Sequence, residues 1–190
     1  MKEPVDEITN AIVSTPRPAA AAPASPPAPG AAPHHVFLID GSGFIFRAYH
    51  ALPPLSRSDG TPTSAVLGFS NMLAKLLSET DADHIAVVFD ASGTSFRNRL
   101  YDQYKAQRPE PPSDLVPQFA LVRRATEAFG VCQIELADFE ADDLIATYAR
   151  HAVEAGAKVT IVSSDKDLMQ LVNDEVTMLD PIKNRPIGIA

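Results

Sequence analysis

The sequence predicts an α/β domain built on a mostly parallel, twisted sheet flanked by helices, preceded by a disordered N-terminal tail. Short continuous apolar runs alternate with amphipathic helical patterns, which is typical of buried parallel strands joined by helices. Acidic residues stand where several of these runs end, and open parallel sheets bind ligands in the crevice beyond the carboxyl ends of their strands. A length of 190 residues suits one domain with a sizeable core plus a tail.

The composition favours a globular protein. The hydrophobic fraction is 45%, which is neither disordered nor membrane-like. No apolar run approaches the roughly 18 residues of a membrane span, and no charged-then-apolar signal segment opens the chain, so we expect a cytoplasmic protein. Cys132 is the only cysteine, which excludes an intramolecular disulfide and thiolate metal sites, and we expect it to be a buried thiol.

Residues 1–34 form the predicted tail, and residues 35–190 the α/β domain. The tail is rich in Ala and Pro, its prolines would break any helix, and its apolar bulk is too small to offset the entropy of ordering. A transit peptide is the weaker alternative, because Arg17 is the only arginine of a segment that also carries three acids.

Five apolar runs predict strands. They lie at residues 36–39, 85–89, 131–136, 159–164 and 176–179. The first ends at Asp40-Gly41-Ser42-Gly43, a tight strand-to-helix passage that lacks the third glycine of a GxGxxG dinucleotide site.

Helical periodicity fills the spaces between these runs. We expect helices at residues 44–51, 61–77, 113–129, from the acidic stretch at 140–143 to near Gly156, and at 168–172. Ser113 is the predicted cap of the third helix, and Ser164 with Asp167 matches a capping box for the last one.

The acidic stretch Glu140-Ala141-Asp142-Asp143 has two interpretations. Acids are favourable at a helix N-terminus, where the macrodipole and free N–H groups attract negative charge. Three carboxylates so close together also repel one another, which a cation among them would relieve. On this stretch alone both interpretations stay open.

Acids elsewhere favour the metal interpretation, because they follow three of the predicted parallel strands. Carboxylates from the strand ends and the acidic stretch would converge on one edge of the sheet. The candidate metal ligands are Asp40, Asp90, Glu140, Asp142, Asp143, Asp165 and Asp167. Without these seven acids the formal net charge of −8 would be −1, so the remaining surface is free to carry basic patches.

The most basic stretch runs from residue 96 to 108. It holds four cations against one acid, with aromatic residues between them. Cations bind phosphates and aromatic rings stack on bases, so this composition suits a nucleic-acid clamp. A solvated amphipathic helix is the alternative.

Together these residues closely resemble the 5′-nuclease domain of bacterial DNA polymerase I, within the flap endonuclease family. The matching motifs are Leu38-Ile39-Asp40-Gly41-Ser42, Arg47-Ala48-Tyr49-His50-Ala51, Val87-Val88-Phe89-Asp90-Ala91, Phe96-Arg97, Tyr104-Lys105 with Arg108-Pro109, Glu140-Ala141-Asp142-Asp143, and Asp165-Lys166-Asp167-Leu168 with Gln170-Leu171. They occur in the family's order and spacing, from about Val36 to the end of the chain.

The resemblance implies a PIN-like, Rossmann-like fold and metal-dependent hydrolysis of DNA at 5′ ends, flaps and nicks, in replication and repair. The seven acids match the family's metal-binding positions, with Mg²⁺ or Mn²⁺ as the ion and two ions in the complete domain. Arg97, Tyr104, Lys105 and Arg108 match its DNA-binding positions. The resemblance also implies a monomer associated with the nucleoid, and a polymerase domain in full-length relatives that these residues do not contain.

The family continues into a glycine- and aspartate-rich segment with further metal ligands and then a helical motif that grips the duplex. This chain ends at Gly188-Ile189-Ala190, before either. We therefore expect an incomplete domain of uncertain activity.

Mechanistically, hard cations prefer oxygen ligands, and two ions roughly 4 Å apart could activate water and stabilise the leaving oxygen. Asp40 and Asp90 would then position metal as part of the catalytic site, and Lys105 would add a positive charge at the scissile phosphate. Two alternatives remain. An inactive remnant would bind DNA or metal without turnover, and an aspartyl phosphatase would use Asp40 as its nucleophile, although Ser42 stands where such enzymes have a second acid.

Overall fold

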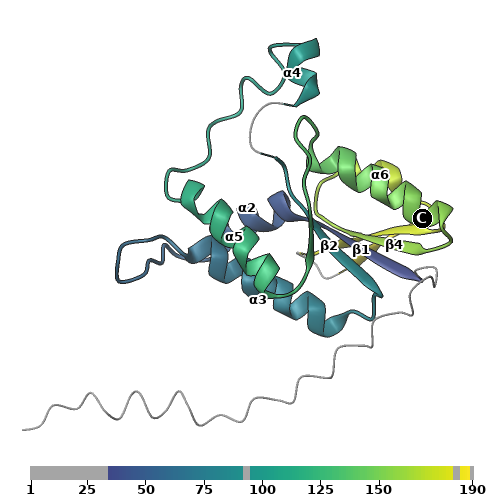
Figure 1. Cartoon of the computed structure of the whole chain (residues 1–190), viewed down its shortest axis with the longest axis horizontal. Helices are drawn as coiled ribbons and strands as arrows, with labels where there is room; N and C mark the ends of the chain where they lie inside the picture. Colours follow the sequence, from purple (N-terminus) through teal and green to yellow (C-terminus); the bar gives the residue numbers. More distant parts are fainter. Residues whose placement is uncertain (1–33, 92–94, 182–184, 189–190) are drawn as a thin grey trace, which may run out of the picture.

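A six-stranded sheet forms the middle layer of the structure, a computed structural model that describes residues 34–91, 95–181 and 185–188 (Figure 1). In spatial order the strands are β3 (Cys132–Ile134), β2 (His84–Val88), β1 (His35–Asp40), β4 (Lys158–Val162), β5 (Val176–Asp180) and β6 (Arg185–Ile187). Strands β1 to β5 pair in parallel, and β6 pairs antiparallel with β5. The prediction of a mostly parallel sheet is confirmed, and the predicted tail lies outside the described residues except for His34.

The central strand β1 is buried on both faces because its side chains alternate between two cores. Phe37 and Ile39 belong to one apolar cluster, whereas Leu38 between them belongs to the other. In the sheet, Leu38 lies between Ala86 of β2 and Ile161 of β4, which are members of the same cluster. This two-sided burial is why the run reads as continuously apolar rather than alternating.

Helices cover the two faces of the sheet as separate layers (Figure 1). Those on one face are α2 (Gly41–Ala51), α3 (Ser64–Glu79) and α5 (Val116–Ala128). The other face carries α6 (Ala141–Glu154) and the short 3₁₀ helix η1 (Asp167–Leu171). The short helix α4 (Phe96–Leu100) stands apart from both layers (Figure 1).

Three helices begin at other residues than the sequence predicted, and one of them, α3, starts at Ser64 rather than at residue 61. Helix α2 starts at Gly41, three residues earlier than expected, because the Gly43 amide donates to the Asp40 carboxylate at 2.8 Å and so closes the first turn. Helix α5 starts at Val116 rather than at residue 113, so the predicted Ser113 cap is wrong. Its first turn carries Pro117, whose missing N–H needs no partner there.

The predicted capping box of Ser164 and Asp167 is also wrong. The Asp167 amide instead donates to the Asp165 carboxylate at 2.9 Å, and the Asp165 amide donates to the Ser163 hydroxyl at 3.0 Å. These bonds hold the turn between β4 and η1, which places Ser163 rather than Ser164 in the interior.

The sheet edges and the basic stretch also differ from expectation. Strand β3 is limited to three residues, and Cys132 at its start is exposed rather than buried. Strand β6 was not predicted, because its three residues include Pro186 and carry no apolar pattern. The basic stretch is helical only over α4, and residues 102–107 form turns. Within the described ranges, no helix has the length and apolar character needed to cross a membrane.

Candidate functional site

Asp40 is the most buried acid at the carboxyl edge of the sheet. It is the last residue of β1 and also the N-cap of α2, and the residue is 7% exposed. The Gly43 amide donates to Oδ1 at 2.8 Å and the Ser163 hydroxyl donates to Oδ2 at 2.7 Å. Burial nevertheless raises the pKa of Asp40, and the charges of Asp90 and Asp165 raise it further.

Asp90 follows β2 and joins this strand to the N-terminus of α6. The Ser42 hydroxyl donates to its Oδ2 at 2.5 Å, and the Ala141 amide at the start of α6 donates to its Oδ1 at 2.8 Å. Arg123 of α5 donates to the Asp90 carbonyl at 3.0 Å and stacks over the Phe89 ring, with 4.8 Å between Cζ and the ring centroid. Both the side chain and the backbone of Asp90 are therefore fixed.

Asp142, in the first turn of α6, completes a group of four acids. Its pKa is raised from the ordinary 3.8 to about 6, first by partial burial and then by the charges of Asp40, Asp165 and Asp90. Carboxylates that raise each other's pKa repel one another, and a cation among them would lower that repulsion. We call Asp40, Asp90, Asp142 and Asp165 the acid cluster.

Glu140 and Asp143 are paired with cations of the basic stretch. Arg97 donates two hydrogen bonds of 2.6 Å to Asp143, and Lys105 donates one of 2.8 Å to Glu140. The Tyr104 hydroxyl also donates to Glu140, at 3.1 Å. The pKa of Asp143 is lowered, mainly by the Arg97 hydrogen bonds.

This geometry resolves the two interpretations of the acidic stretch in an unexpected way. Glu140 is the N-cap of α6 and forms a capping box with Asp143, so the capping interpretation holds for these two acids. Protein cations offset the charge of Glu140 and Asp143, whereas the pKa of Asp142 is raised by its burial and by the charges of other acids. The three neighbours therefore have different partners.

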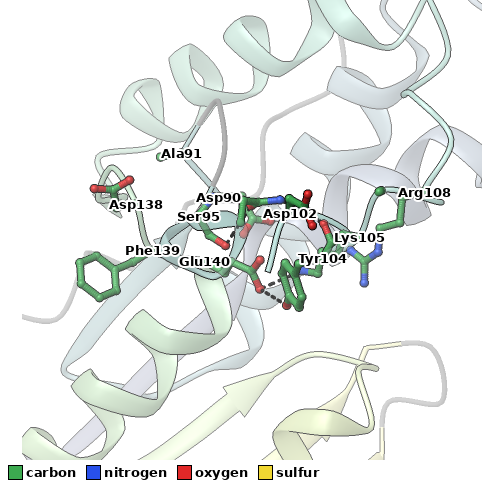
Figure 2. Close-up of a pocket in the computed structure, with 12 residues that line it drawn as sticks. Asp90, Ala91, Ser95, Asp102, Tyr104, Lys105, Arg108, Asp138, Phe139 and Glu140 are labelled. Carbon is green, nitrogen blue, oxygen red and sulfur yellow. Dashed lines mark hydrogen bonds and ion pairs between the residues drawn. The ribbon is translucent and has the colours of Figure 1, made fainter. Parts of the chain in front are cut away.

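A pocket of about 330 Å³ lies between the basic stretch and the start of α6. Figure 2 shows Tyr104 and Lys105 both reaching Glu140 there, with Arg108 beyond them. Asp90 lines the same pocket, so one acid of the cluster lies at the opening that the basic stretch borders.

The predicted site residues thus fall into three groups. Four form the acid cluster, and Glu140 and Asp143 are paired with Arg97, Tyr104 and Lys105. Asp167 and Arg108 are exposed, and neither takes part in an ion pair between described residues. As they are arranged in the described ranges, no three His, Cys, Asp or Glu side chains lie close enough together to hold a metal ion. The acid cluster fits a divalent ion by its chemistry, since its donors are all carboxylate oxygens whose charges oppose one another.

Three supporting residues were not predicted as part of the site. Ser163 and Ser42 each donate to one acid of the cluster, and Arg123 holds the Asp90 carbonyl. Both serines stand within two residues of a candidate acid, which was the available sequence signal. The sequence offered no such signal for Arg123, because this residue lies 33 positions away from Asp90.

Comparison with known proteins identifies the family. A family model for the 5′-3′ exonuclease N-terminal resolvase-like domain matches residues 35–188. A DNA polymerase I from Rhizobium leguminosarum is 60% identical over 163 residues, which is 82% of this chain and 16% of that protein. A 5′-3′ exonuclease from Aquifex aeolicus is 40% identical over 149 residues, which is 78% of this chain and 52% of that protein.

Solved structures agree on the fold. A bacteriophage T5 flap endonuclease in a pseudo-enzyme–product complex with DNA and metal ions matches 82% of this chain and 58% of its own, with a TM-score of 0.61 and 21% identity. T5 5′-exonuclease with bound zinc also matches 82% of this chain and 58% of its own, with a TM-score of 0.59 and 24% identity.

The chain spans at most about half the length of these curated relatives. The match nevertheless extends over nearly all of the α/β domain and includes the acids of β1, β2, α6 and the turn after β4. This chain belongs to the family of 5′-3′ exonuclease N-terminal resolvase-like domains.

Proposed function

We propose that this domain is a metal-dependent DNA nuclease that hydrolyses phosphodiester bonds at 5′ ends, flaps and nicks. The observation that carries the proposal is the acid cluster, in which the repulsion that raises the pKa of Asp142 would be relieved by divalent ions. Family membership supports the same activity, since its relatives are named DNA polymerase I and 5′-3′ exonuclease. Chromosomal DNA as substrate would imply association with the nucleoid.

In this proposal the acid cluster holds the metal, and Glu140 and Asp167 extend the set of ligands. Mg²⁺ is the proposed ion and Mn²⁺ a substitute, because both prefer oxygen donors. Bound ions, two of them in a complete site, would supply an activated water and stabilise the leaving oxygen. Structures of T5 nucleases with metal ions are consistent with such a cofactor.

The chain's own residues would orient the cluster and bring DNA to it. Ser163 and the Gly43 amide fix Asp40, while Ser42 and the Ala141 amide fix Asp90, so these carboxylates cannot rotate freely. Lys105 lies at the pocket shared with Asp90 and could exchange its bond to Glu140 for one to a phosphate oxygen. Tyr104 and Arg108 would contact the same strand.

An aspartyl phosphatase fits the geometry poorly. Such an enzyme needs a second acid two residues after its nucleophile, whereas that position holds Ser42, whose hydroxyl donates to Asp90. The inactive remnant differs from the proposed nuclease only in turnover, so cleavage is the experiment that separates them.

The test uses the purified chain with a 5′-flap DNA labelled at its 5′ end. We expect short labelled products in Mg²⁺ or Mn²⁺, no products with a chelator, and none from Asp142→Asn. Binding of DNA without any product in either metal would favour the remnant. Release of phosphate from a 5′-phosphorylated DNA strand, without cleavage of any internucleotide bond, would favour the phosphatase.

A further inference from the structure

Arg123 connects the ends of two neighbouring strands to α5. Its Nη2 donates to the backbone carbonyl of Asp90, just past the end of β2, at 3.0 Å. Its Nε donates at 2.9 Å to Oε2 of Glu135, which directly follows β3, and Nη2 lies 2.8 Å from the same oxygen. The strand ends are also joined to each other, because the Phe89 amide donates to the Ile134 carbonyl at 2.8 Å. One guanidinium therefore holds both strand ends against the same helix.

The guanidinium of Arg123 also lies over a tightly packed ring. Its Cζ is 4.8 Å from the centroid of Phe89, which is 1% exposed. Phe89 packs so closely against the start of α2 that a Cβ added to Gly41 would lie 2.5 Å from its ring. A planar guanidinium can stack on a ring while its edge donates to a carbonyl and a carboxylate. Arg123 is thus fixed by the apolar core as well as by its hydrogen bonds.

The carbonyl that Arg123 holds belongs to an acid of the acid cluster. The side chain of Asp90 accepts from the Ser42 hydroxyl at 2.5 Å and from the Ala141 amide at 2.8 Å. These donors lie in the first turns of α2 and α6, and hydrogen bonds weaken steeply when they are misaligned. The Asp90 carboxylate can therefore meet both donors only while its backbone stays in place.

We propose that Arg123 is a positioning residue for metal binding, which holds the Asp90 carboxylate in the acid cluster through the Asp90 backbone. The proposal rests on the proposed function, in which this cluster holds a divalent ion. It assigns Arg123 an effect opposite to that of its charge. Removing a nearby positive charge would by itself raise the affinity for a metal ion, whereas removing a positioning contact would lower it. The direction of the change in affinity therefore separates the two effects.

The test compares Arg123→Gln with Arg124→Gln in Mn²⁺ binding without DNA, measured by calorimetry at pH 7. Arg124 is the matched control, because it is the next residue of α5, is exposed, and forms no ion pair with any described residue. Both substitutions change the net charge by the same amount. We expect Arg123→Gln to bind Mn²⁺ about tenfold more weakly, as when a group that orients a metal ligand is lost. Arg124→Gln should change the affinity by about twofold or less, because solvent and salt screen its charge. An unchanged or higher affinity in Arg123→Gln would overturn the proposal.

A second measurement requires no metal. Amide hydrogen exchange, followed by NMR in a chelator, compares the Ala141 amide with the Gly43 amide, which donates to Asp40 at 2.8 Å. Both amides lie at the start of a helix and are held by an acid of the cluster. Arg123→Gln should speed exchange at Ala141 by about tenfold and change that at Gly43 by about twofold or less, because only the bond to Asp90 opens more often. No change at Ala141, or equal changes at both amides, would contradict a specific action on Asp90.

A double variant tests the route through Asp90. If Arg123 acts only through this acid, Arg123→Gln combined with Asp90→Asn should bind Mn²⁺ no more weakly than Asp90→Asn alone. A further loss of affinity would overturn the proposal.

Should Arg123→Gln fail to fold, Arg123→Lys takes its place. Lysine keeps the charge, but its ammonium lacks the planar edge that meets Glu135 and the Asp90 carbonyl together. Weaker Mn²⁺ binding with faster exchange at Ala141 is again expected, and normal values of both would overturn the proposal. The proposed function fails separately, if the unmodified chain neither binds Mn²⁺ nor cuts flap DNA, whereas exchange at Ala141 would still report on Arg123.

Discussion

At the scale of single residues, the site depends on carboxylates that are held in place against their mutual repulsion. Asp142 shows most clearly that this repulsion disfavours the charged form, because its pKa is raised to about 6 by burial and by the other three acids of the cluster. Burial also raises the pKa of Asp40, and hydrogen bonds from Gly43 and Ser163 reduce that rise. Acid clusters of this kind lower stability until a cation or a proton offsets the charge.

The raised pKa of Asp142 predicts a pH dependence of stability without metal. Between about pH 3.8 and pH 6 the folded protein holds a proton on Asp142 that the unfolded chain has lost, so this group makes the free energy of unfolding fall as pH rises. Asp142→Asn should remove this contribution. Its stability relative to the unmodified protein should therefore increase from pH 4 to pH 7, as measured by urea unfolding in a chelator.

Metal binding provides the control for that prediction. Affinity of the unmodified protein for Mn²⁺ should rise as pH passes through about 6, because the ion displaces the Asp142 proton. Asp142→Asn should bind Mn²⁺ weakly while remaining folded. If the variant unfolds instead, Asp142 is a structural acid and its assignment to the metal site is wrong.

Ser163 predicts a second effect at this scale. Its hydroxyl is buried and donates to the buried carboxylate of Asp40, so Ser163→Ala should cost about 1–3 kcal/mol in the free energy of unfolding. Ser164→Ala is the matched control, because the adjacent serine is exposed and should change stability by less than about 0.5 kcal/mol. Chemical denaturation at pH 7 measures both, and equal effects would contradict the assigned role of Ser163.

At the scale of elements, the site arises where the basic stretch meets the N-terminus of α6. The two segments lie 35 to 46 residues apart in sequence, yet Arg97 and Lys105 each bind an acid of α6 or its cap. Lys105 adopts a left-handed backbone conformation with φ of 56°, which is uncommon for a non-glycine residue. Two cations of the basic stretch are thus held beside acids at the start of α6.

Lys105 predicts an effect on DNA binding and an opposite effect on metal binding. Lys105→Ala should lower the log–log salt slope of DNA affinity by about 1, because one phosphate contact is lost, with little change in sequence preference. The same change removes a cation 2.8 Å from Glu140, so affinity for Mn²⁺ without DNA should rise. Fluorescence anisotropy and calorimetry measure the two affinities.

Lys75→Ala provides the control, because Lys75 lies on α3 and is paired with Glu79 rather than with a site residue. It changes the net charge by the same amount and should leave both measurements nearly unaltered. An unchanged salt slope and an unchanged Mn²⁺ affinity in Lys105→Ala would mean that this stretch is only a solvated surface.

At the scale of the whole molecule, stability comes from two apolar cores on opposite faces of the sheet, and the acids lie at one end of both. Phe69 is fully buried in the core beneath α2 and α3, with its ring 6.2 Å from Phe44 and 6.4 Å from Phe89. Substitutions in the core should therefore change the free energy of unfolding without changing the charges of the acid cluster.

Phe69→Ala should lower the free energy of unfolding by about 3–5 kcal/mol, because it removes a large buried side chain and leaves a cavity. Leu67→Ala, two residues earlier on the same helix and 46% exposed, should change it by about 0.5 kcal/mol or less. Urea unfolding compares the two. Similar losses in both variants would contradict the placement of the core on this face of α3.

The sequence by itself determined the five parallel strands, the mostly parallel sheet and the end of the sheet that carries the acids, but not the antiparallel strand β6. Hydrophobic periodicity is local, so the strand cores and most helices could be predicted, and an acid directly after a parallel strand must lie at its carboxyl edge. The same locality explains the errors. The early start of α2 and the late start of α5 depend on which group satisfies the first amides of each helix, and neither Ser113 nor Ser164 caps a helix as the pattern predicted.

Only the tertiary structure decided which acid has which partner. Three acids within four residues look equivalent in the sequence, yet other acids raise the pKa of Asp142 while Lys105 and Arg97 bind Glu140 and Asp143. The hydroxyl that holds Asp40 comes from a residue 123 positions away. Such pairings depend on how packed layers bring distant side chains within hydrogen-bond distance, and local patterns carry no information about that distance.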